Sequence, residues 1–360
     1  MNRAASDHDS ARRRGAMFAL TSALVFGGGA PAAKLLLESI DPWLMAGFLY
    51  VGAGVGLSLL RVGRRLAMRK VEAEAGLRGR DWLWFSGAAI SGGIAAPALL
   101  MAGLTKTPAS TGSLFLNLEA VLTVLVAWAV FREHVGRHVF IGVAAVIAGG
   151  VVLAWQGEGG FEGFLGPLLI AGACLAWALD NNLTQKISLS DPFQIGAIRG
   201  LLAGPINVGL AFLAGASSPA WDIALGSAGL GFMSYGLGLA CFVFALRHLG
   251  TARAGAFFAT APFLGAIISV TALGEPVTIQ LGVAGVLMAF GAWFIVRDNH
   301  EHEHEHEPMT HNHRHRHDLH HRHDHAPDDP PGEPHSHAHA HVRLRHRHPH
   351  APDEHHRHRH

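Results

Sequence analysis

The sequence predicts an all-α integral membrane protein: ten transmembrane helices form two inverted five-helix repeats, and a disordered C-terminal tail follows. Three observations support this prediction: ten apolar runs, basic residues confined to one side, and a change of composition at residue 300. The last 61 residues hold 23 of the 27 histidines, whereas the first 299 hold all 29 aromatic residues. Such a body is too apolar for a soluble domain, and such a tail buries too little apolar surface to fold alone. The composition therefore argues against a soluble globular enzyme.

Each apolar run has the length of a membrane span, which needs about 20 mostly apolar residues. The run that begins after Arg14 extends past about 20 residues without a convincing cleavage site, so we interpret it as the first span and not as a signal peptide. The connections are short, and no segment leaves room for a soluble catalytic domain. The expected spans are approximately 15–37, 42–61, 81–103, 108–130, 138–155, 164–185, 192–213, 223–245, 252–273 and 277–296.

The basic residues set the orientation, because Lys and Arg beside a span are retained in the cytoplasm. With the N-terminus inside, the cytoplasmic segments hold 17 basic residues and the outer segments hold Lys106 alone. We therefore expect a multi-pass protein of the inner (plasma) membrane with both termini in the cytoplasm. The two cysteines, Cys174 and Cys241, fall within spans and indicate no disulfide framework.

The two halves of the body repeat the same features in the same order. Asp41-Pro42 opens the second span and Asp191-Pro192 opens the seventh, while Glu133 ends the fourth span as Glu275 ends the ninth. Lys34 and Lys186 also occupy matching ends of spans one and six. A unit of five spans is odd, so the second unit inserts upside down relative to the first. The expected parts are a cytoplasmic N-terminus (1–14), a first repeat (15–155), a second repeat (156–299) and the tail (300–360).

At this point the sequence resembles the EamA-type ten-span carriers of the drug/metabolite transporter superfamily, over residues 15–297. The most telling pieces are Ala245-Leu246-Arg247-His248-Leu249-Gly250, Ala261-Pro262-Phe263 and Leu273-Gly274-Glu275-Pro276. The first repeat departs from the second, with Ala120 in place of Pro262 and Leu49 in place of Arg199. The resemblance implies a secondary carrier and not an enzyme, commonly an exporter of amino acids, related metabolites or toxic organic compounds.

Charged side chains within spans are costly in hydrocarbon, so each needs a reason. Glu119 lies near the middle of span four, two residues after Asn117, and either exchanges a proton or contacts a substrate amine, or is a protonated group bonded to a neighbouring helix. Asp180 and Arg199 lie at similar depth on adjacent spans, by count at 1.5 Å per residue. They form either a gate that opens and closes with alternating access or a static pair.

The remaining candidates for the substrate path are the amide of Asn181 and two aromatic side chains. Trp177 and Tyr235 either stack on a substrate or anchor the protein at the membrane interface. Lys34 and Glu38 have the i,i+4 spacing of an interfacial anchor. Four prolines interrupt spans, where freed carbonyls either line a cavity or permit close helix packing: Pro31, Pro97, Pro205 and Pro262.

In the tail, histidine alternates with single residues, and neutral imidazole is a ligand for Zn, Cu, Ni and Co. The alternative is a solvated polar tail without a ligand. No cofactor is required, and metal at the tail either serves efflux, regulates the carrier or is buffered. The candidate ligands are His302, His304, His306, His311, His313, His315, His317, His335, His337, His339 and His341.

Three hypotheses follow from these patterns. The first is a small-organic-solute exporter with a metal-binding tail, and the alternative is a divalent Ni, Co or Zn efflux carrier fed or gated by the tail. A membrane-tethered metal buffer or sensor is the third. The chain has no Gly-x-x-x-x-Gly-Lys-Ser/Thr motif, so ATP hydrolysis is not supported. We expect a lipid bilayer, a small-molecule substrate and transition-metal ions as partners, and no nucleic acid, and leave a homodimer open.

Overall fold

The structure is a computed structural model of the chain. It describes residues 2–67, 77, 79, 81–131, 136–155, 160–187, 191–249, 251–296, 300–306, 309–315, 335–341 and 344–350. Within these residues, ten helical segments are long and apolar enough to cross a membrane, and each begins and ends within three residues of its predicted run. Ten spans are therefore confirmed: Arg13–Leu36, Pro42–Arg64, Asp81–Thr105, Ala109–Ala129, Arg137–Ala154, Gly163–Gln185, Phe193–Leu213, Trp221–Leu246, Arg253–Ala272 and Ile279–Val296.

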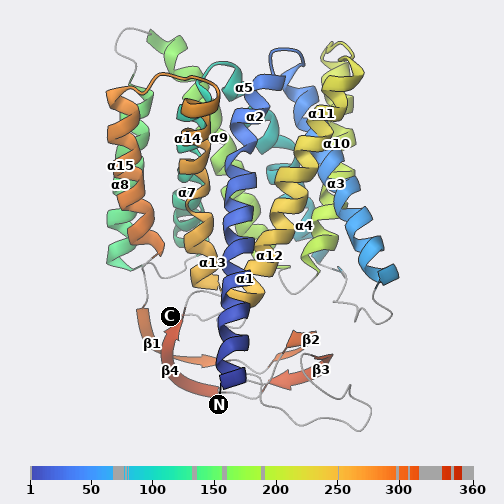
Figure 1. The fold of residues 1–360 in the computed structure, drawn as a ribbon, viewed down its shortest axis with the longest axis vertical. Helices are drawn as coiled ribbons and strands as arrows, with labels where there is room; N and C mark the ends of the chain where they lie inside the picture. The colour runs from blue at the N-terminus through green and yellow to red at the C-terminus, as the bar shows by residue number, and fades with distance from the viewer. Residues whose placement is uncertain are drawn as a thin grey trace.

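The first five spans contain nine helical elements. They are α1 (Asn2–Gly27), α2 (Gly29–Leu36), α3 (Pro42–Ala67), α4 (Asp81–Ala88), η1 (Ala89–Ala95), α5 (Ala96–Thr105), α6 (Ala109–Phe115), α7 (Asn117–Ala129) and α8 (Arg137–Ala154). The other five spans are α9 (Gly160–Gln185), α10 (Pro192–Leu213), α11 (Trp221–Gly231), η2 (Phe232–Leu237), α12 (Gly238–Leu249), α13 (Thr251–Phe258), α14 (Ala261–Ala272) and α15 (Ile279–Val296). The first set begins at one end of the bundle and finishes at the other, and the second set returns (Figure 1).

Two kinds of interruption occur at matching places in the two sets, whereas the break at Gly28 in the first span has no counterpart in α9. The third and eighth spans each contain a π-helical turn, η1 and η2, and the fourth and ninth spans each break in the middle, at Leu116 and at 259–260. Three of the four predicted prolines lie beside an interruption: Pro31 is in the first turn of α2 after the break at Gly28, Pro97 follows η1, and Pro262 is in the first turn of α14. Pro205, by contrast, lies inside the continuous helix α10. The π turn at η2 and the break at Leu116 have no proline within them.

Helices α3 and α10 show the internal repeat at atomic detail. An Asp caps each helix: Asp41 accepts hydrogen bonds from the two backbone N–H groups of residues 43 and 44, and Asp191 accepts from those of residues 193 and 194. The helices cross at glycines. A Cβ added at Gly54 would lie 2.6 Å from the nitrogen of residue 201, and one at Gly204 would lie 2.6 Å from the nitrogen of residue 51. These equal contacts relate the two halves by an approximate two-fold axis.

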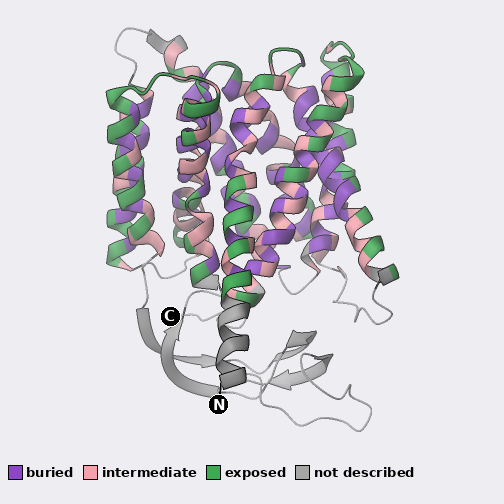
Figure 2. Cartoon of the chain, in the orientation of Figure 1, coloured by how far each residue is buried: buried purple, intermediate pink, exposed green. Residues whose placement is uncertain are grey.

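Apolar side chains cover the outside of the bundle. Buried residues concentrate between the helices, while exposed residues follow their outer faces (Figure 2). Among the exposed side chains, Leu213 is 86% and Ile279 83% accessible, which would be unfavourable in water and is expected against lipid.

The tail contains four short strands among its described residues. These are β1 (His300–His306), β2 (Met309–His315), β3 (His335–His341) and β4 (Leu344–His350), in two antiparallel pairs, β1 with β4 and β2 with β3. They lie at the end of the bundle where α1 begins (Figure 1). Disorder of the tail as a whole stays a prediction, and within the tail these four described segments are extended and paired. Alternating histidine has the period of two that suits a strand. Tail side chains and the other tail residues lie outside the described part.

Candidate functional site

A cavity of about 340 Å³ lies inside the bundle between the two repeats. Eight of the ten spans contribute lining residues, and among the described residues α8 and α15 contribute none. The volume is within the range of small-molecule sites in proteins. Six of the seven residues that the sequence predicts for the substrate path line this cavity: Glu119, Trp177, Asp180, Asn181, Arg199 and Tyr235.

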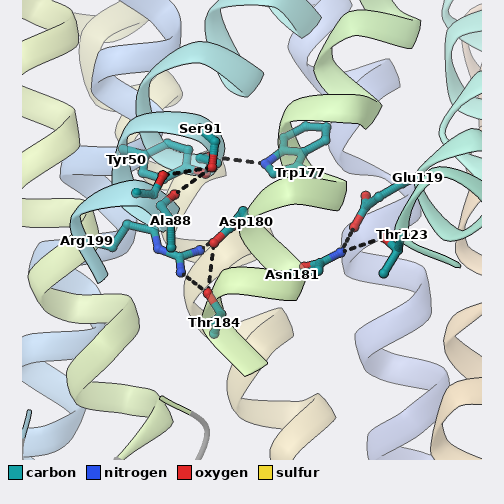
Figure 3. A network of polar contacts seen from close by, with 12 residues as sticks. Tyr50, Ala88, Ser91, Glu119, Thr123, Trp177, Asp180, Asn181, Thr184 and Arg199 are labelled. Atoms are coloured by element: carbon teal, nitrogen blue, oxygen red, sulfur yellow. Dashed lines mark hydrogen bonds and ion pairs between the residues drawn. The ribbon is translucent and has the colours of Figure 1, made fainter. Parts of the chain in front are cut away.

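The predicted contact between Asp180 of α9 and Arg199 of α10 is present. Arg199 Nη1 lies 2.6 Å from Asp180 Oδ2, and the two side chains are 16% and 5% exposed. Thr184, one turn after Asp180, completes the cluster: its hydroxyl donates to Asp180 Oδ1 at 2.9 Å and accepts from Arg199 Nη2 at 2.9 Å (Figure 3). The two charges are thus neutralised within the protein.

A glycine in the π turn makes room for this pair. A Cβ added at Gly92 of η1 would collide with the carboxylate of Asp180, so a larger side chain here displaces one of them. Glycine is therefore needed at position 92 because the Asp180 carboxylate approaches the η1 backbone closely, in addition to any role in helix packing.

Glu119 forms a second and separate polar contact. Asn181 Nδ2 donates to Glu119 Oε1 at 2.9 Å and lies 3.3 Å from the hydroxyl of Thr123. Asp180 and Asn181 are neighbours on α9, and they extend to opposite sides, toward Arg199 and toward Glu119 (Figure 3). Within the described part of the chain, no Lys or Arg forms an ion pair with Glu119. Its carboxylate has only neutral partners.

The π turn supplies backbone acceptors to side chains around the cavity. The Gly92 carbonyl accepts from the Tyr50 hydroxyl at 2.5 Å and from the Trp177 indole at 3.1 Å. The next carbonyl, that of Gly93, accepts from Asn207 at 3.0 Å. Such π turns are frequent at functional sites. The sequence reasoning missed Tyr50, although only two tyrosines occur in the chain and both line the cavity.

Aromatic rings form much of the remaining wall. The Tyr50 and Tyr235 rings are 5.6 Å apart between centroids, and Phe26 lies 6.1 Å from Tyr235 and 4.9 Å from Phe258. Phe242 packs on Phe258 at 4.9 Å. A ligand in this cavity would therefore meet an apolar, aromatic surface with two polar groups, the Glu119 contact and the Asp180 cluster.

Two sequence expectations differ from the structure. Asn117 does not line the cavity: it is buried, and its amide donates to the Leu114 carbonyl at 2.9 Å. The Lys34 ammonium donates to the carbonyls of Leu104 and of Thr107 rather than forming an ion pair with Glu38. These carbonyls lie at and just after the C-terminal end of α5, where carbonyl groups lack partners within the helix and a lysine ammonium binds favourably.

Glu275 connects the two repeats at the end of the bundle opposite the tail. Its carboxylate accepts from the backbone N–H groups of Ala109, at 2.6 Å, and Ser110, at 2.8 Å, and so caps α6. Its partner in the repeat, Glu133, lies outside the described residues. The internal repeat of the sequence predicts that the two glutamates correspond, but it does not indicate that Glu275 caps a helix.

The predicted tail ligands stay a prediction, because their side chains lie outside the described part of the structure, and His317 lies outside it entirely. Elsewhere in the described residues, no group of three or more His, Cys, Asp or Glu is arranged to hold a metal ion.

The chain is similar to known membrane transporters along most of its length. The sequence profile of the EamA-like transporter family matches residues 13–155 and 164–297. An uncharacterized transporter of Methanothermobacter thermautotrophicus is 27% identical over 290 residues, covering 77% of this chain and 84% of that protein. An uncharacterized transporter of Clostridium kluyveri is 19% identical over 294 residues, covering 78% and 92%. A crystal structure described only as that of a protein has a similar fold, with a TM-score of 0.57 at 18% identity, covering 80% of this chain and 99% of that one.

Proposed function

The chain belongs to the EamA-like transporter family and is a multi-pass membrane transporter, and we propose that it exports small organic metabolites, namely amino acids, related metabolites or toxic organic compounds, by alternating access. The observation that supports this proposal is the cavity between the repeats, which is lined by three charged groups of the spans, those of Glu119, Asp180 and Arg199. Carriers built from inverted repeats bind substrate at the repeat interface near the middle of the membrane.

The Asp180–Arg199 pair is the proposed gate. It joins α9 to α10 inside the cavity, and both helices belong to the second repeat. Because the pair is nearly buried, separating it exposes two charges that need new partners, such as water or substrate. Entry of water or substrate would stabilise the arrangement in which the Asp180–Arg199 pair is separated. Substrate binding would in this way be coupled to movement of α9 and α10.

A growth assay tests the export proposal. The full chain and a chain stopped after Asn299 are expressed in a bacterium sensitive to amino-acid analogues and to nickel, cobalt and zinc. We expect protection against organic compounds that persists on truncation and disappears in Arg199→Met. If the full chain protects only against metals and the truncated chain does not, the result would contradict export of organic solutes and support metal efflux.

We further propose that the protein lies in the inner membrane with both termini in the cytoplasm. The 17-to-1 distribution of basic residues supports the cytoplasmic side, and the position of β1–β4 at the end where α1 begins supports placing both termini on the same side (Figure 1). A reporter that is active only in the periplasm, fused after His360, should be inactive. Activity of this fusion would overturn the cytoplasmic assignment.

For the tail, we propose binding of Zn, Ni, Co or Cu by imidazoles. The backbone register supports this, since His302 pairs with His348, His304 with His346 and His313 with His337, and residues directly opposite in a ladder are close neighbours. Titration of the purified full chain with NiCl₂ or ZnCl₂ should give binding that the chain stopped after Asn299 lacks. Equal binding by both chains would contradict the proposal.

A further inference from the structure

The charges in the cavity do not balance. Three acidic or basic side chains line it, namely Glu119, Asp180 and Arg199. Arg199 is bonded to Asp180 Oδ2 and to the hydroxyl of Thr184, so its positive charge is already neutralised. Glu119 is left with an amide and no cation among the described residues. The cavity therefore has one carboxylate in excess.

The surroundings of Glu119 favour a cation more than a neutral or anionic ligand. A carboxylate removed from water is stabilised by a positive partner, and an amide donor replaces only part of its lost hydration. Asn181 Nδ2 donates to Oε1 of Glu119, so the two oxygens of the carboxylate keep further lone pairs as acceptors for a ligand. An ammonium group with three donors matches this pair of acceptors.

The aromatic rings complete the same chemistry. Tyr50 and Trp177 use their polar atoms on the Gly92 carbonyl, so their rings are the parts left to line the cavity. Tyr235 and Phe26 continue this wall. Aromatic faces attract cations and accept apolar groups, which suits an apolar body attached to an ammonium group.

We propose that the cavity selects organic monocations that carry an apolar body, and that their ammonium group binds the Glu119 carboxylate beside Asn181. Zwitterionic amino acids are disfavoured, because their carboxylate meets the uncompensated Glu119 and an Arg199 whose charge Asp180 already balances, with only the buried Nε of Arg199 left without a partner. The inference rests on the proposed export function and narrows its substrates from amino acids and related compounds to amines.

A matched ligand series tests this selection on the purified full chain in detergent micelles. Phenethylammonium, phenylalanine and 3-phenylpropionate share one ring and differ in charge, and 2-phenylethanol is the neutral analogue. By calorimetry we expect phenethylammonium to bind at least about tenfold tighter than phenylalanine, because both ligands make the ammonium contact but phenylalanine must also desolvate a carboxylate without a cation, which costs at least that much. The anion should bind weakest.

Variants locate the selection at one residue. Glu119→Gln should weaken phenethylammonium at least about tenfold and leave 2-phenylethanol within about twofold. Glu119→Asp, which keeps the charge, should retain the preference for the amine and guards against a folding defect. Glu38→Gln is the control, because Glu38 carries a carboxylate that does not line the cavity. Equal binding of phenylalanine and phenethylammonium, or unchanged amine binding in Glu119→Gln, would overturn the inference.

Transport in proteoliposomes separates this inference from the proposed function. If the protein moves phenylalanine in an Arg199-dependent manner and neither binds nor moves the amine, the substrate class is wrong and export stands. If it moves none of the four compounds and expression protects cells against no organic compound, both are overturned. Movement of phenethylammonium that Glu119→Gln removes supports both.

Discussion

The two repeats share a backbone and differ in the chemistry of their side chains. Gly54 and Gly204 make the same close contact across the α3–α10 crossing, and Asp41 and Asp191 cap the same helix start. At the position of Arg199, however, the first repeat has Leu49, which also lines the cavity. A two-fold backbone supplies two equivalent arrangements for alternating access, while the unequal side chains build a single polar site. Substitutions at repeat-related positions can therefore separate scaffold from site.

The largest effect is expected where the repeats differ, at Arg199 and Leu49. Arg199→Met leaves Asp180 as a buried carboxylate without its cation, which should lower the free energy of unfolding by about 3 kcal/mol and abolish most transport. Leu49→Met places the same side chain at the related position and should cost less than about 1.5 kcal/mol with transport retained. Chemical denaturation in micelles and a transport assay measure both. Similar losses in the two variants would show that the polar asymmetry has no role.

An intermediate and equal effect is expected where the repeats agree most closely. Gly54→Ala and Gly204→Ala each force a Cβ against the backbone of the opposite helix, which should lower stability by about 1–3 kcal/mol. Gly282→Ala is the matched control, because nothing lies within 4 Å of a Cβ added there. Thermal unfolding in detergent is the readout. Clearly unequal losses at Gly54 and Gly204 would break the two-fold relation.

A smaller effect is expected at the helix caps. Asp41→Ala and Asp191→Ala each remove a side-chain cap, at about 1 kcal/mol. Asp191→Ala should cost slightly more, because Arg61 Nε lies 3.1 Å from its carboxylate. Repeating both substitutions in an Arg61→Gln background should remove the difference, as a double-mutant cycle requires. A difference that persists there would have another origin.

The smallest effect is expected at the tail. Stopping the chain after Asn299 should leave transport of organic solutes within about twofold, because the described residues that line the cavity all lie between Phe26 and Phe258, and should remove metal binding. Uptake into vesicles and metal titration measure the two properties on the same preparations. A large loss of organic-solute transport on truncation would make the tail part of the transport path.

Most of the fold is predictable from the sequence because membrane spans depend on local hydrophobic length. The same reasoning places Asp180 near Arg199, since helix rise converts residue count into depth. Facing is less predictable: Asn117 and Glu119 are two residues apart, hence about 200° apart around a helix, and only one of them can face the cavity. Counting residues along a span gives the depth of a side chain in the membrane. Which side of the helix faces the cavity depends on where the neighbouring helices pack.

Other features of the site depend on contacts between distant segments. The carbonyl of Gly92 becomes an acceptor for Tyr50 and Trp177 only because η1 is a π turn, and nothing at 89–95 besides the glycine run signals this. The Glu275 cap on α6 joins residues more than 160 apart in the chain. Local sequence patterns draw attention to such residues, but they do not show which distant residues these contact.

Cysteine accessibility tests most directly whether the cavity between the repeats is the transport path. Leu230 lines the cavity, whereas Leu225 on the same helix α11 is 65% exposed on the outer face of the bundle. Each is replaced by cysteine after Cys174 and Cys241, both buried, are changed to alanine. A water-soluble, membrane-impermeant thiol reagent should modify Leu230→Cys from either side of the membrane, more slowly with substrate present, and should not modify Leu225→Cys. Modification of Leu230→Cys from one side only, or from neither, would contradict an alternating-access path through this cavity.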